Sequence, residues 1–378
     1  MKRIAPISGG PRPPRRSRYG AAVRLIPVDS LQAGDLEAWE ALAADAAEPN
    51  PFFERRLVID GVDALAASGV ALLVAADPGG DWIGAFPVTV ERRLGLLRLA
   101  EAWRHHYSYL GTPLVADGRV DQFAEELVAA LGSGGHFDHL MVRRCSVGPV
   151  LEAIEGAVAG ERGIDILFER QFERGAYRGR EPERELDWIK GKKRSELRRQ
   201  RRKLGEELGT EIEVVDRPDT AAAVDDFLAL EGSGWKGEQG TALASQDGSA
   251  DLFRRMCDSF AAAGRLQIRA LRAGERNLAM TCDLASGPTL FGFKSAYDES
   301  LRRYSPGVQL QTENFGFFDR ERDEELFDSC AEPGNEMING LWPDRRKIAT
   351  VVLGPGGIRG AVTRRVLERA YAQRQDSD

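Results

Sequence analysis

The sequence predicts an α/β protein made of two similar lobes, each with a mixed, mainly antiparallel sheet flanked by helices. Two stretches, GVALLVAADPGGDWIGAFPV from Gly69 and GRLQIRALRAGERNLAMTCDL from Gly264, each contain a strand, a glycine turn and a second strand of similar length. The chain has 378 residues, 42% of them hydrophobic, which is enough for two packed domains. We therefore expect a duplicated lobe, with its copies at residues 21–180 and 181–354.

In the N-terminal half, turn residues separate apolar segments of strand and helix period. The run Asp77-Pro78-Gly79-Gly80 is a turn between two β-rich segments, and Val120, Phe123 and Leu127 recur at helical spacing. The predicted elements are helices at 36–47, 120–131 and 149–158, and strands at 70–76, 82–92, 94–100 and 139–144.

The C-terminal half repeats this order. Asp219 is a plausible N-cap for a helix, and Ser249 is expected to cap another that stops at Gly264. A meander with turns at Gly274 and Gly287 follows them. The predicted strands are 266–272, 278–284, 289–296 and 325–327, with a helix at 190–204 before them and another from about Val308.

The two ends of the chain differ in composition from the lobes. Residues 1–20 are rich in Pro, Gly and Arg and contain no acidic residue, which indicates a disordered basic tail or an arm that touches anionic lipid. Residues 359–374, within a C-terminal segment at 355–378, have the pattern of a closing amphipathic helix.

Composition argues against several classes of protein. The net charge of −7 argues against a general nucleic-acid binder. The four cysteines have no CxxC spacing and there are only four histidines, so neither a disulfide framework nor a metal site is expected, and a reducing cytoplasm fits best. No apolar run approaches the roughly 20 residues needed to span a bilayer.

The stretch at 289–318 has the pattern of an anion site. A strand leads into Tyr304-Ser305-Pro306-Gly307 and then into a helix, whose first backbone N–H groups have no intrahelical partner. Arg302 and Arg303 add positive charge before the turn. An ordinary strand-to-helix turn is the alternative. Because P-loop and Rossmann spacings are absent here, an acyl-CoA or another nucleotide-linked donor is the chemical candidate.

The segment at 190–204 is strongly basic. Leu197 and Leu204 lie seven residues apart, so one helix face can be buried while the others stay charged. Three interpretations remain open: a solvated helix, a docking face for phosphate of CoA or a lipid headgroup, and an RNA contact.

Four motifs in order resemble a known family. KKRSELRRQRRKL, LEGSGWKGEQGTALA, GRLQIRALRAGERNLAM and FGFKSAYDESLRRYSPGVQL are similar to segments of GNAT-superfamily acyltransferases, over residues 190–342. In particular they resemble the acetyltransferases of cellulose and exopolysaccharide operons and the bacterial ceramide-forming N-acyltransferases. Fem-type aminoacyl-tRNA-dependent transferases, which have two GNAT lobes, are more distantly similar. The resemblance therefore implies tandem GNAT-like lobes.

The resemblance implies a donor thioester between two splayed strands, with its pyrophosphate on the loop before a helix. A backbone N–H at 293–295 is the oxyanion donor by this analogy. The usual pattern has two glycines in the loop, whereas this chain has one, so a longer acyl chain or an acyl carrier protein is also open as donor. Residues 335–342 contain no tyrosine for the leaving thiolate, so no general acid is assigned. The donor-binding candidates are Arg303, Ser305, Pro306, Gly307, Val308 and Gln309.

An amine that attacks a thioester needs a base and a positioned carbonyl, but no enzyme nucleophile. The candidate bases are Glu231, His106 and Asp328. Glu231 lies near a helix end, a neutral imidazole of His106 suits a base near neutral pH, and Asp328 follows a predicted strand. A surface carboxylate, a packed histidine and a structural aspartate are the respective alternatives. The candidate substrate-binding residues are Tyr107, Tyr109, Trp235, Lys236, Lys294 and Tyr297.

We therefore expect an N-acyltransferase that uses acyl-CoA as co-substrate, without a metal. Its acceptor would be a primary amine of an envelope component, either a long-chain base or an amino sugar. The enzyme would be cytoplasmic, with peripheral contact to an anionic membrane surface left open by the basic segments. The rivals are a Fem-type aminoacyl-tRNA-dependent transferase and a non-catalytic scaffold of an envelope-synthesis complex.

Overall fold

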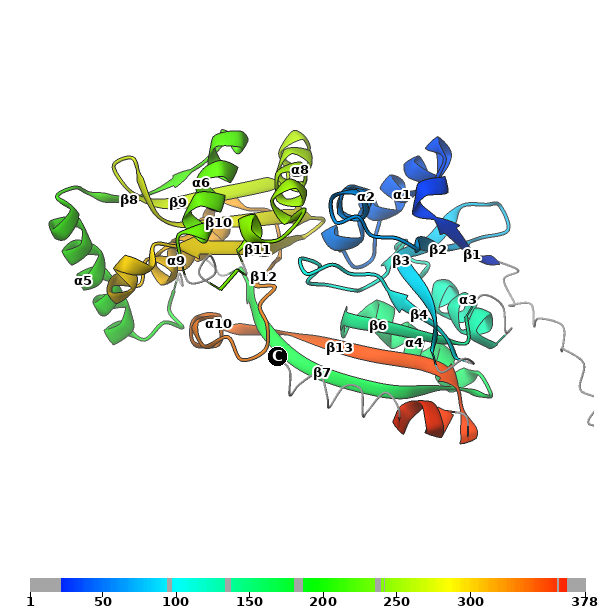
Figure 1. Cartoon of the computed structure of the whole chain (residues 1–378). Coiled ribbons are helices and arrows are strands. Elements are labelled where there is room, and N and C mark those ends of the chain that lie inside the picture. The colour runs from blue at the N-terminus through cyan, green and yellow to red at the C-terminus, as the bar shows by residue number, and fades with distance from the viewer. Residues whose placement is uncertain are drawn as a thin grey trace, which may run out of the picture.

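One continuous sheet runs through both halves of the protein (Figure 1). The computed structural model describes residues 22–93, 97–132, 137–179, 186–234, 239–240, 242–358 and 360–365. Within them, 13 strands form the order β1-β2-β3-β4-β6-β13-β7-β12-β11-β10-β9-β8, with β5 paired to β3. Most neighbours are antiparallel, and helices flank the sheet, so the predicted fold class is confirmed.

The N-terminal half begins with a strand and two helices, followed by a meander. Asn50 caps a 3-10 turn by accepting a hydrogen bond from the backbone N–H of Phe52. The elements are β1 (Ala22–Pro27), η1 (Val28–Ser30), α1 (Ala33–Ala44), η2 (Pro51–Phe53), α2 (Arg55–Ala64), β2 (Val70–Ala76), β3 (Trp82–Arg93), β4 (Leu97–Ala102), β5 (Leu114–Val115), α3 (Val120–Gly132), β6 (His139–Ser146), α4 (Pro149–Gly160) and β7 (Ile164–Arg178).

The C-terminal half repeats the sequence of two helices, meander, helix and strand. Asp219 is confirmed as an N-cap, since its side chain accepts from the Ala222 amide. The elements are α5 (Gly191–Leu208), β8 (Ile212–Asp216), α6 (Thr220–Gly232), η4 (Leu243–Ser245), α8 (Ser249–Ala262), β9 (Leu266–Ala273), β10 (Arg276–Ser286), β11 (Thr289–Tyr297), η5 (Glu299–Tyr304), α9 (Pro306–Glu321), β12 (Leu326–Asp328), α10 (Glu336–Leu341) and β13 (Asp344–Pro355).

The duplication is visible in the strand pairing. In each half the last strand of the meander pairs in parallel with the strand that follows the next helix: β4 with β6 across α3, and β11 with β12 across α9. These are the two parallel pairs among the described strands. A parallel neighbour needs a crossover connection, which α3 and α9 supply.

Two long strands that the sequence did not predict join the halves. β13, near the C-terminus, lies between β6 and β7 and pairs with β7 along its length. The last residues of β7 also pair with β12. In Figure 1 this β7–β13 ribbon starts at the middle of the molecule, near β12 and α10, and runs beneath the N-terminal half. The boundary at residue 180/181 stays a prediction, because the sheet is shared across it.

Two helix starts differ from the sequence-based expectation. Gly248, in a left-handed conformation with φ of 72°, is the N-cap of α8, and Ser249 is its first residue rather than its cap. α9 begins at Pro306 rather than near Val308, because proline with its fixed φ suits the first helical position. The predicted tail at 1–20 lies outside the described residues. Of the C-terminal segment, residues 357–358 and 360–365 are helical, and 359 and 366–378 lie outside the described residues.

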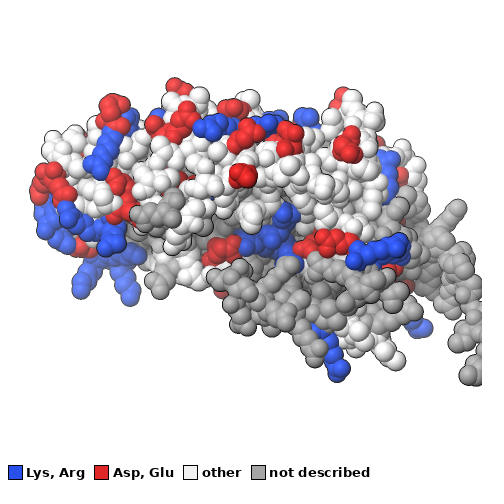
Figure 2. Space-filling model, viewed as in Figure 1, with Lys and Arg blue, Asp and Glu red and all other residues white. Residues whose placement is uncertain are grey.

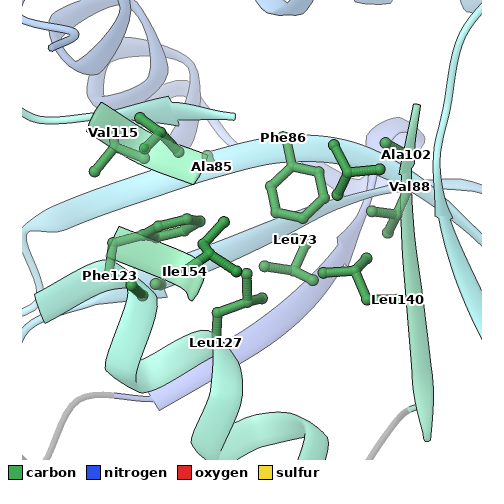
Figure 3. Close-up of a cluster of buried hydrophobic side chains, with 14 of the residues drawn as sticks. Leu73, Ala85, Phe86, Val88, Ala102, Val115, Phe123, Leu127, Leu140 and Ile154 are labelled. Atoms are coloured by element: carbon green, nitrogen blue, oxygen red, sulfur yellow. The ribbon is translucent and has the colours of Figure 1, made fainter. Parts of the chain in front are cut away.

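Apolar burial stabilises both halves and the junction between them. In the N-terminal half, Phe86, Phe123 and Leu140 belong to a cluster between the sheet and the helices α3 and α4 (Figure 3). A second cluster joins Phe52 of the N-terminal half to Phe253 and Phe293 of the C-terminal half. Each fully buried phenylalanine contributes roughly 1.5–3 kcal/mol to the stability of the fold. Because these side chains come from both halves, the junction between the halves is a packed core.

Candidate active site

β11 and β12 part in the middle of the C-terminal half. They pair only from Thr289↔Leu326 to Phe291↔Asp328, and β11 then continues to Tyr297 beside β10. The register of β10 and β11 shifts between Cys282 and Asp283, so one extra residue of β11 bulges at this point. The predicted splay of two strands is therefore present, and the predicted oxyanion donors at 293–295 lie on the diverging part of β11.

The N-terminus of α9 lies beside this opening. Its N-cap Ser305 has φ of 53° and makes no side-chain capping bond, and Pro306 has no N–H. The Gln309 amide donates to the Ser305 carbonyl oxygen at 3.0 Å. The amides of Gly307 and Val308 precede the first intrahelical bond and face no acceptor within the described part of the chain. The turn therefore offers two open N–H groups, and the binding of an anion by them stays a prediction.

The other donor-binding candidates surround this turn. Gln309 is buried; its amide nitrogen donates to the Tyr304 carbonyl oxygen at 2.7 Å, and its Oε1 has no partner among the described residues. Arg303 instead extends to α5, where it forms an ion pair with Glu207. Tyr297 lies against Gly307, since a Cβ built on that glycine would lie 3.6 Å from the tyrosine Cδ1 atom.

A small hollow lies between the end of α6 and the end of β11. Two carboxylates line it, and the charge of one of them, Glu231, is partly balanced by Lys294. Its lining residues are Leu230, Glu231, Gly234, Ser295, Ala296, Tyr297 and Glu299.

Glu231 lines the hollow, although it is a buried residue. It is 3% exposed, and its Oε2 accepts from the Leu243 amide at 2.9 Å. Its Oε1 lies 3.3 Å from Nζ of Lys294, on β11. The structure thus brings together a candidate base and a candidate substrate-binding residue that are 63 positions apart in the chain.

The N-terminal half contributes aromatic side chains to this place. Nζ of Lys294 lies 4.9 Å from the ring centroid of Tyr107, and the Tyr107 hydroxyl donates to Oε1 of Gln246 at 3.0 Å. Tyr109 packs edge-on against Phe293, with 5.7 Å between ring centroids. Burial raises the pKa of both tyrosines, so both are neutral near pH 7.

The two neighbouring histidines have different environments. His106 is exposed, whereas His105 packs against Trp103 and Tyr107. Burial, with Arg104 and His106 nearby, lowers the pKa of His105 to about 3, so its imidazole stays neutral. The loop therefore turns His105 inward, and His106 is not among the residues that line the hollow.

Asp328 is the centre of a buried ion-pair network. Its Oδ2 accepts from Nη2 of Arg174 at 2.6 Å and from Nη1 of Arg346 at 2.8 Å, and its Oδ1 accepts from the Cys330 amide at 2.9 Å. Burial alone would raise its pKa, but the two guanidinium groups and these bonds lower it. A carboxylate held in this way favours the structural alternative over a base.

Two candidate residues lie outside the described part of the chain, and three residues near the site were not predicted. Trp235 and Lys236 lie outside the described residues. Arg174 and Arg346, on the unpredicted strands β7 and β13, were not singled out in the sequence. Glu299, just after the donor strand, is the missed residue with the clearest signal, because it follows the candidate Tyr297 by two positions.

One family model matches part of the C-terminal half. The family described as "Acetyltransferase (GNAT) domain" matches residues 191–328, from α5 to β12. No curated protein matches the chain in sequence. The match and the site support a protein of the acyltransferase class.

Solved structures extend the likeness to both halves. The crystal structure of FemX covers 84% of this chain and 95% of its own, at 10% identity and a TM-score of 0.55. The match to a conserved protein of unknown function from Bacteroides thetaiotaomicron covers 87% of this chain and 99% of that protein's chain, at 13% identity and a TM-score of 0.51. The C-terminal domain of a putative lysylphosphatidylglycerol synthetase from Agrobacterium fabrum covers 88% and 94%, at 14% identity and a TM-score of 0.51. At these identities the likeness establishes the fold.

Among the described residues, no helix combines the length and the apolar character needed to cross a membrane. Within the same residues, no group of three or more His, Cys, Asp or Glu side chains is placed to hold a metal ion.

Proposed function

We propose that the protein is an N-acyltransferase that moves an acyl group from an acyl thioester to a primary amine. The donor is acyl-CoA or an acyl carrier protein, and the acceptor is an amine of an envelope component, either an amino sugar or a long-chain base. The observation that carries this proposal is the meeting of an uncapped helix N-terminus, two parting strands and a buried carboxylate at one end of β11.

The donor would lie in the opening between β11 and β12. Its phosphate would accept hydrogen bonds from the Gly307 and Val308 amides, where the helix dipole favours negative charge. Its thioester carbonyl would lie against the bulged part of β11, where a backbone N–H stabilises the oxyanion. The amides that would bind the phosphate and the N–H that would stabilise the oxyanion belong to one continuous stretch of chain. The distance between them is therefore set by β11, η5 and α9.

The acceptor amine would enter by the hollow lined by Glu231 and Glu299. The ammonium is attracted by the carboxylates and must lose a proton before or during attack. Glu231 is the base we favour, because it lines the hollow and lies next to the donor strand. Lys294 forms an ion pair with it, and the ring of Tyr107 packs against the Lys294 ammonium. His106 and Asp328 are the less favoured candidates, for the positions described above.

The reaction needs no covalent intermediate on the protein. The amine nitrogen attacks the carbonyl carbon, the C–S bond breaks, and the thiolate leaves and takes up a proton. Tyr109 and Tyr297 would form walls for acyl group and donor, and Trp235 and Lys236 stay proposed substrate contacts.

We further propose that the enzyme works in the cytoplasm, with peripheral contact to the inner membrane face where its acceptor is a lipid. The Fem-type alternative would replace the thioester by an aminoacyl-tRNA, and the scaffold alternative would have no turnover. The basic helix α5 keeps the first alternative open, and the net charge of −7 argues against it.

The test is release of free thiol from acetyl-CoA, palmitoyl-CoA and the corresponding acyl carrier proteins, with a panel of amino sugars and long-chain bases. Turnover that depends on both thioester and amine supports the proposal. Transfer from aminoacyl-tRNA alone would establish the Fem-type alternative. Absence of turnover with every donor, together with capture of a partner enzyme, would favour the scaffold.

A further inference from the structure

α5 carries a charge opposite in sign to that of the chain. Its sequence GKKRSELRRQRRKLGEEL has eight basic and three acidic residues, whereas the whole chain has a net charge of −7. Lys192, Lys193 and Arg194 lie in its first turn, which has no acidic residue. Cations at this end oppose the helix dipole and cost stability. The charge is therefore poorly explained by the helix itself and points to an anionic ligand outside it.

The basic helix leads directly to the mouth of the donor site. At its C-terminal end Glu207 accepts from Arg303 and from the hydroxyl of Tyr304, just before α9. Farther back, Arg201 pairs with Glu313 of α9, and Lys193 donates to the Gly340 carbonyl oxygen of α10. At 1.5 Å per residue the helix extends about 27 Å from the mouth. Figures 1 and 2 show α5 and its lysines and arginines at the left edge of the molecule.

The mouth itself offers few amides. Pro306 occupies the first helical position and has no N–H, and the Gln309 amide is bonded to Ser305. Only the Gly307 and Val308 amides remain at this turn, which matches the oxygens of one phosphate better than those of a diphosphate. The buried Oε1 of Gln309, without a partner among the described residues, adds an acceptor for an N–H or O–H of the ligand.

We propose that the preferred donor is an acyl group on the phosphopantetheine of an acidic carrier protein, which docks along α5. This inference rests on the proposed function and names its donor. The single phosphate of the arm would occupy the α9 N-terminus, and acidic side chains of the carrier would face Lys192, Arg198 and Lys203, all exposed on α5. The acyl C–S bond breaks as the C–N bond forms, and the thiolate of the arm takes up a proton.

Two other anionic occupants fit less well. Helices that lie on membranes place an apolar face in the lipid, but the apolar side of α5 is used inside the protein, where Leu204 packs with Leu301 and Leu310. Surfaces that bind single-stranded RNA usually supply aromatic side chains for base stacking, and α5 has none. An acidic protein needs only the exposed cations.

The experiment uses the full chain and compares palmitoyl- and acetyl-acyl carrier protein with palmitoyl- and acetyl-CoA as donors. The test variant is Lys192→Glu/Arg198→Glu/Lys203→Glu. The matched control, Arg92→Glu/Arg162→Glu/Lys347→Glu, makes the same charge change at exposed positions outside α5. We expect the α5 variant to lower kcat/KM for the carrier-bound donor at least about 10-fold. Its kcat/KM for acyl-CoA should stay within about 3-fold of that of the unaltered protein. The control should change neither by more than about 3-fold, and salt should weaken only the carrier reaction.

Several results would overturn the inference. One is equal loss for both donors; another is a carrier-bound donor that is no better than acyl-CoA in the unaltered protein. Loss of binding to vesicles containing phosphatidylglycerol, or to bulk tRNA, with unchanged use of the carrier would assign α5 to those partners instead. Turnover with acyl-CoA but none with the carrier defeats this inference alone, whereas no turnover with any thioester defeats the proposed function as well.

Discussion

Nζ of Lys294 lies 3.3 Å from Oε1 of Glu231, and both side chains are almost excluded from solvent, at 12% and 1% exposure. One residue comes from the donor strand β11 and the other from the end of α6. A buried ion pair of this kind loses much hydration, so it is weak evidence for stability. Its position at the hollow, beside the parting of β11 and β12, is better explained by chemistry.

Replacement of Glu231 by Gln should abolish most of the acyl transfer. The amide oxygen can still accept from the Leu243 amide, but it cannot take a proton from the amine. We expect kcat to fall about 100-fold or more, as for removal of a general base, with little change in KM for the donor. Thiol release measured at saturating thioester checks this.

The control for Glu231→Gln is Glu213→Gln, at an exposed position on β8. It should retain full activity. If Glu231→Gln stays within about 3-fold of the unaltered protein, Glu231 is not the base, and His106 becomes the next candidate to replace.

Tyr107 should contribute through its ring rather than its hydroxyl. Its ring centroid lies 4.9 Å from Nζ of Lys294, and such contacts are worth about 0.5–2 kcal/mol. Tyr107→Phe should therefore keep kcat/KM within about 3-fold, whereas Tyr107→Leu should lower it about 10-fold. Steady-state kinetics on the two variants decides between ring and hydroxyl; the reverse ranking would assign the role to the hydrogen bond with Gln246.

Asp328 should prove structural. Asp328→Asn leaves the buried guanidinium of Arg174 without a counter-charge, a change that costs about 3–5 kcal/mol. Chemical denaturation should show this loss, while the folded fraction keeps kcat within about 3-fold. Loss of kcat at unchanged stability would return Asp328 to the candidate bases.

The Asp328 carboxylate should make the free energy of unfolding depend on pH in the acidic range. Its pKa in the folded protein is lowered by Arg174 and Arg346 despite burial, so the unfolded chain binds a proton at a higher pH than the native one. The stabilisation is complete above the unfolded-state value near 3.9 and should be lost as pH falls through the folded-state value.

Asp283 should have the opposite effect on stability. It is 3% exposed, and burial raises its pKa to about 8, against the opposing influence of Arg269 and Arg322. Between about pH 4 and 8 the folded state then binds a proton that the unfolded state lacks, so stability falls as pH rises. Asp283→Asn mimics the protonated form and should stabilise the protein at pH 9 by about 1 kcal/mol or more. Equal unfolding curves for both proteins at pH 9 would contradict this.

The repeated meander and its helices could be predicted because their signals are local. The strand at Val70–Ala76 and the cap at Asp219 follow directly from apolar runs and turn residues. β7 could not be recognised in this way, because charged residues interrupt it; β13 contains a local apolar run at 348–353, but its place between β6 and β7 depends on pairing with distant strands. Such non-local pairing has no local sequence pattern.

The site shows the same limit. The donor loop at Gly307 was recognisable from its composition, and Glu231, Lys294 and Tyr107 were each singled out, but nothing in their spacing shows that they meet. The contact of Glu231 with Lys294 depends on how α6 packs against β11, and Tyr107 joins it because the two halves pack at Phe293. Likewise the loop conformation, not the sequence, decides that His105 is turned inward and His106 outward.

The central claim is that the α9 N-terminus holds the phosphate of an acyl thioester, and Gly307→Asp tests it most directly. Aspartate in the first turn favours the helix dipole, and a Cβ here makes only ordinary contact with Tyr297, so the fold should not suffer. Gly307→Ala is the matched control without charge. We predict that Asp raises KM for the thioester about 10-fold or more while Ala changes it less than about 3-fold. Equal donor KM for the two variants, in a protein that turns over, would contradict the account.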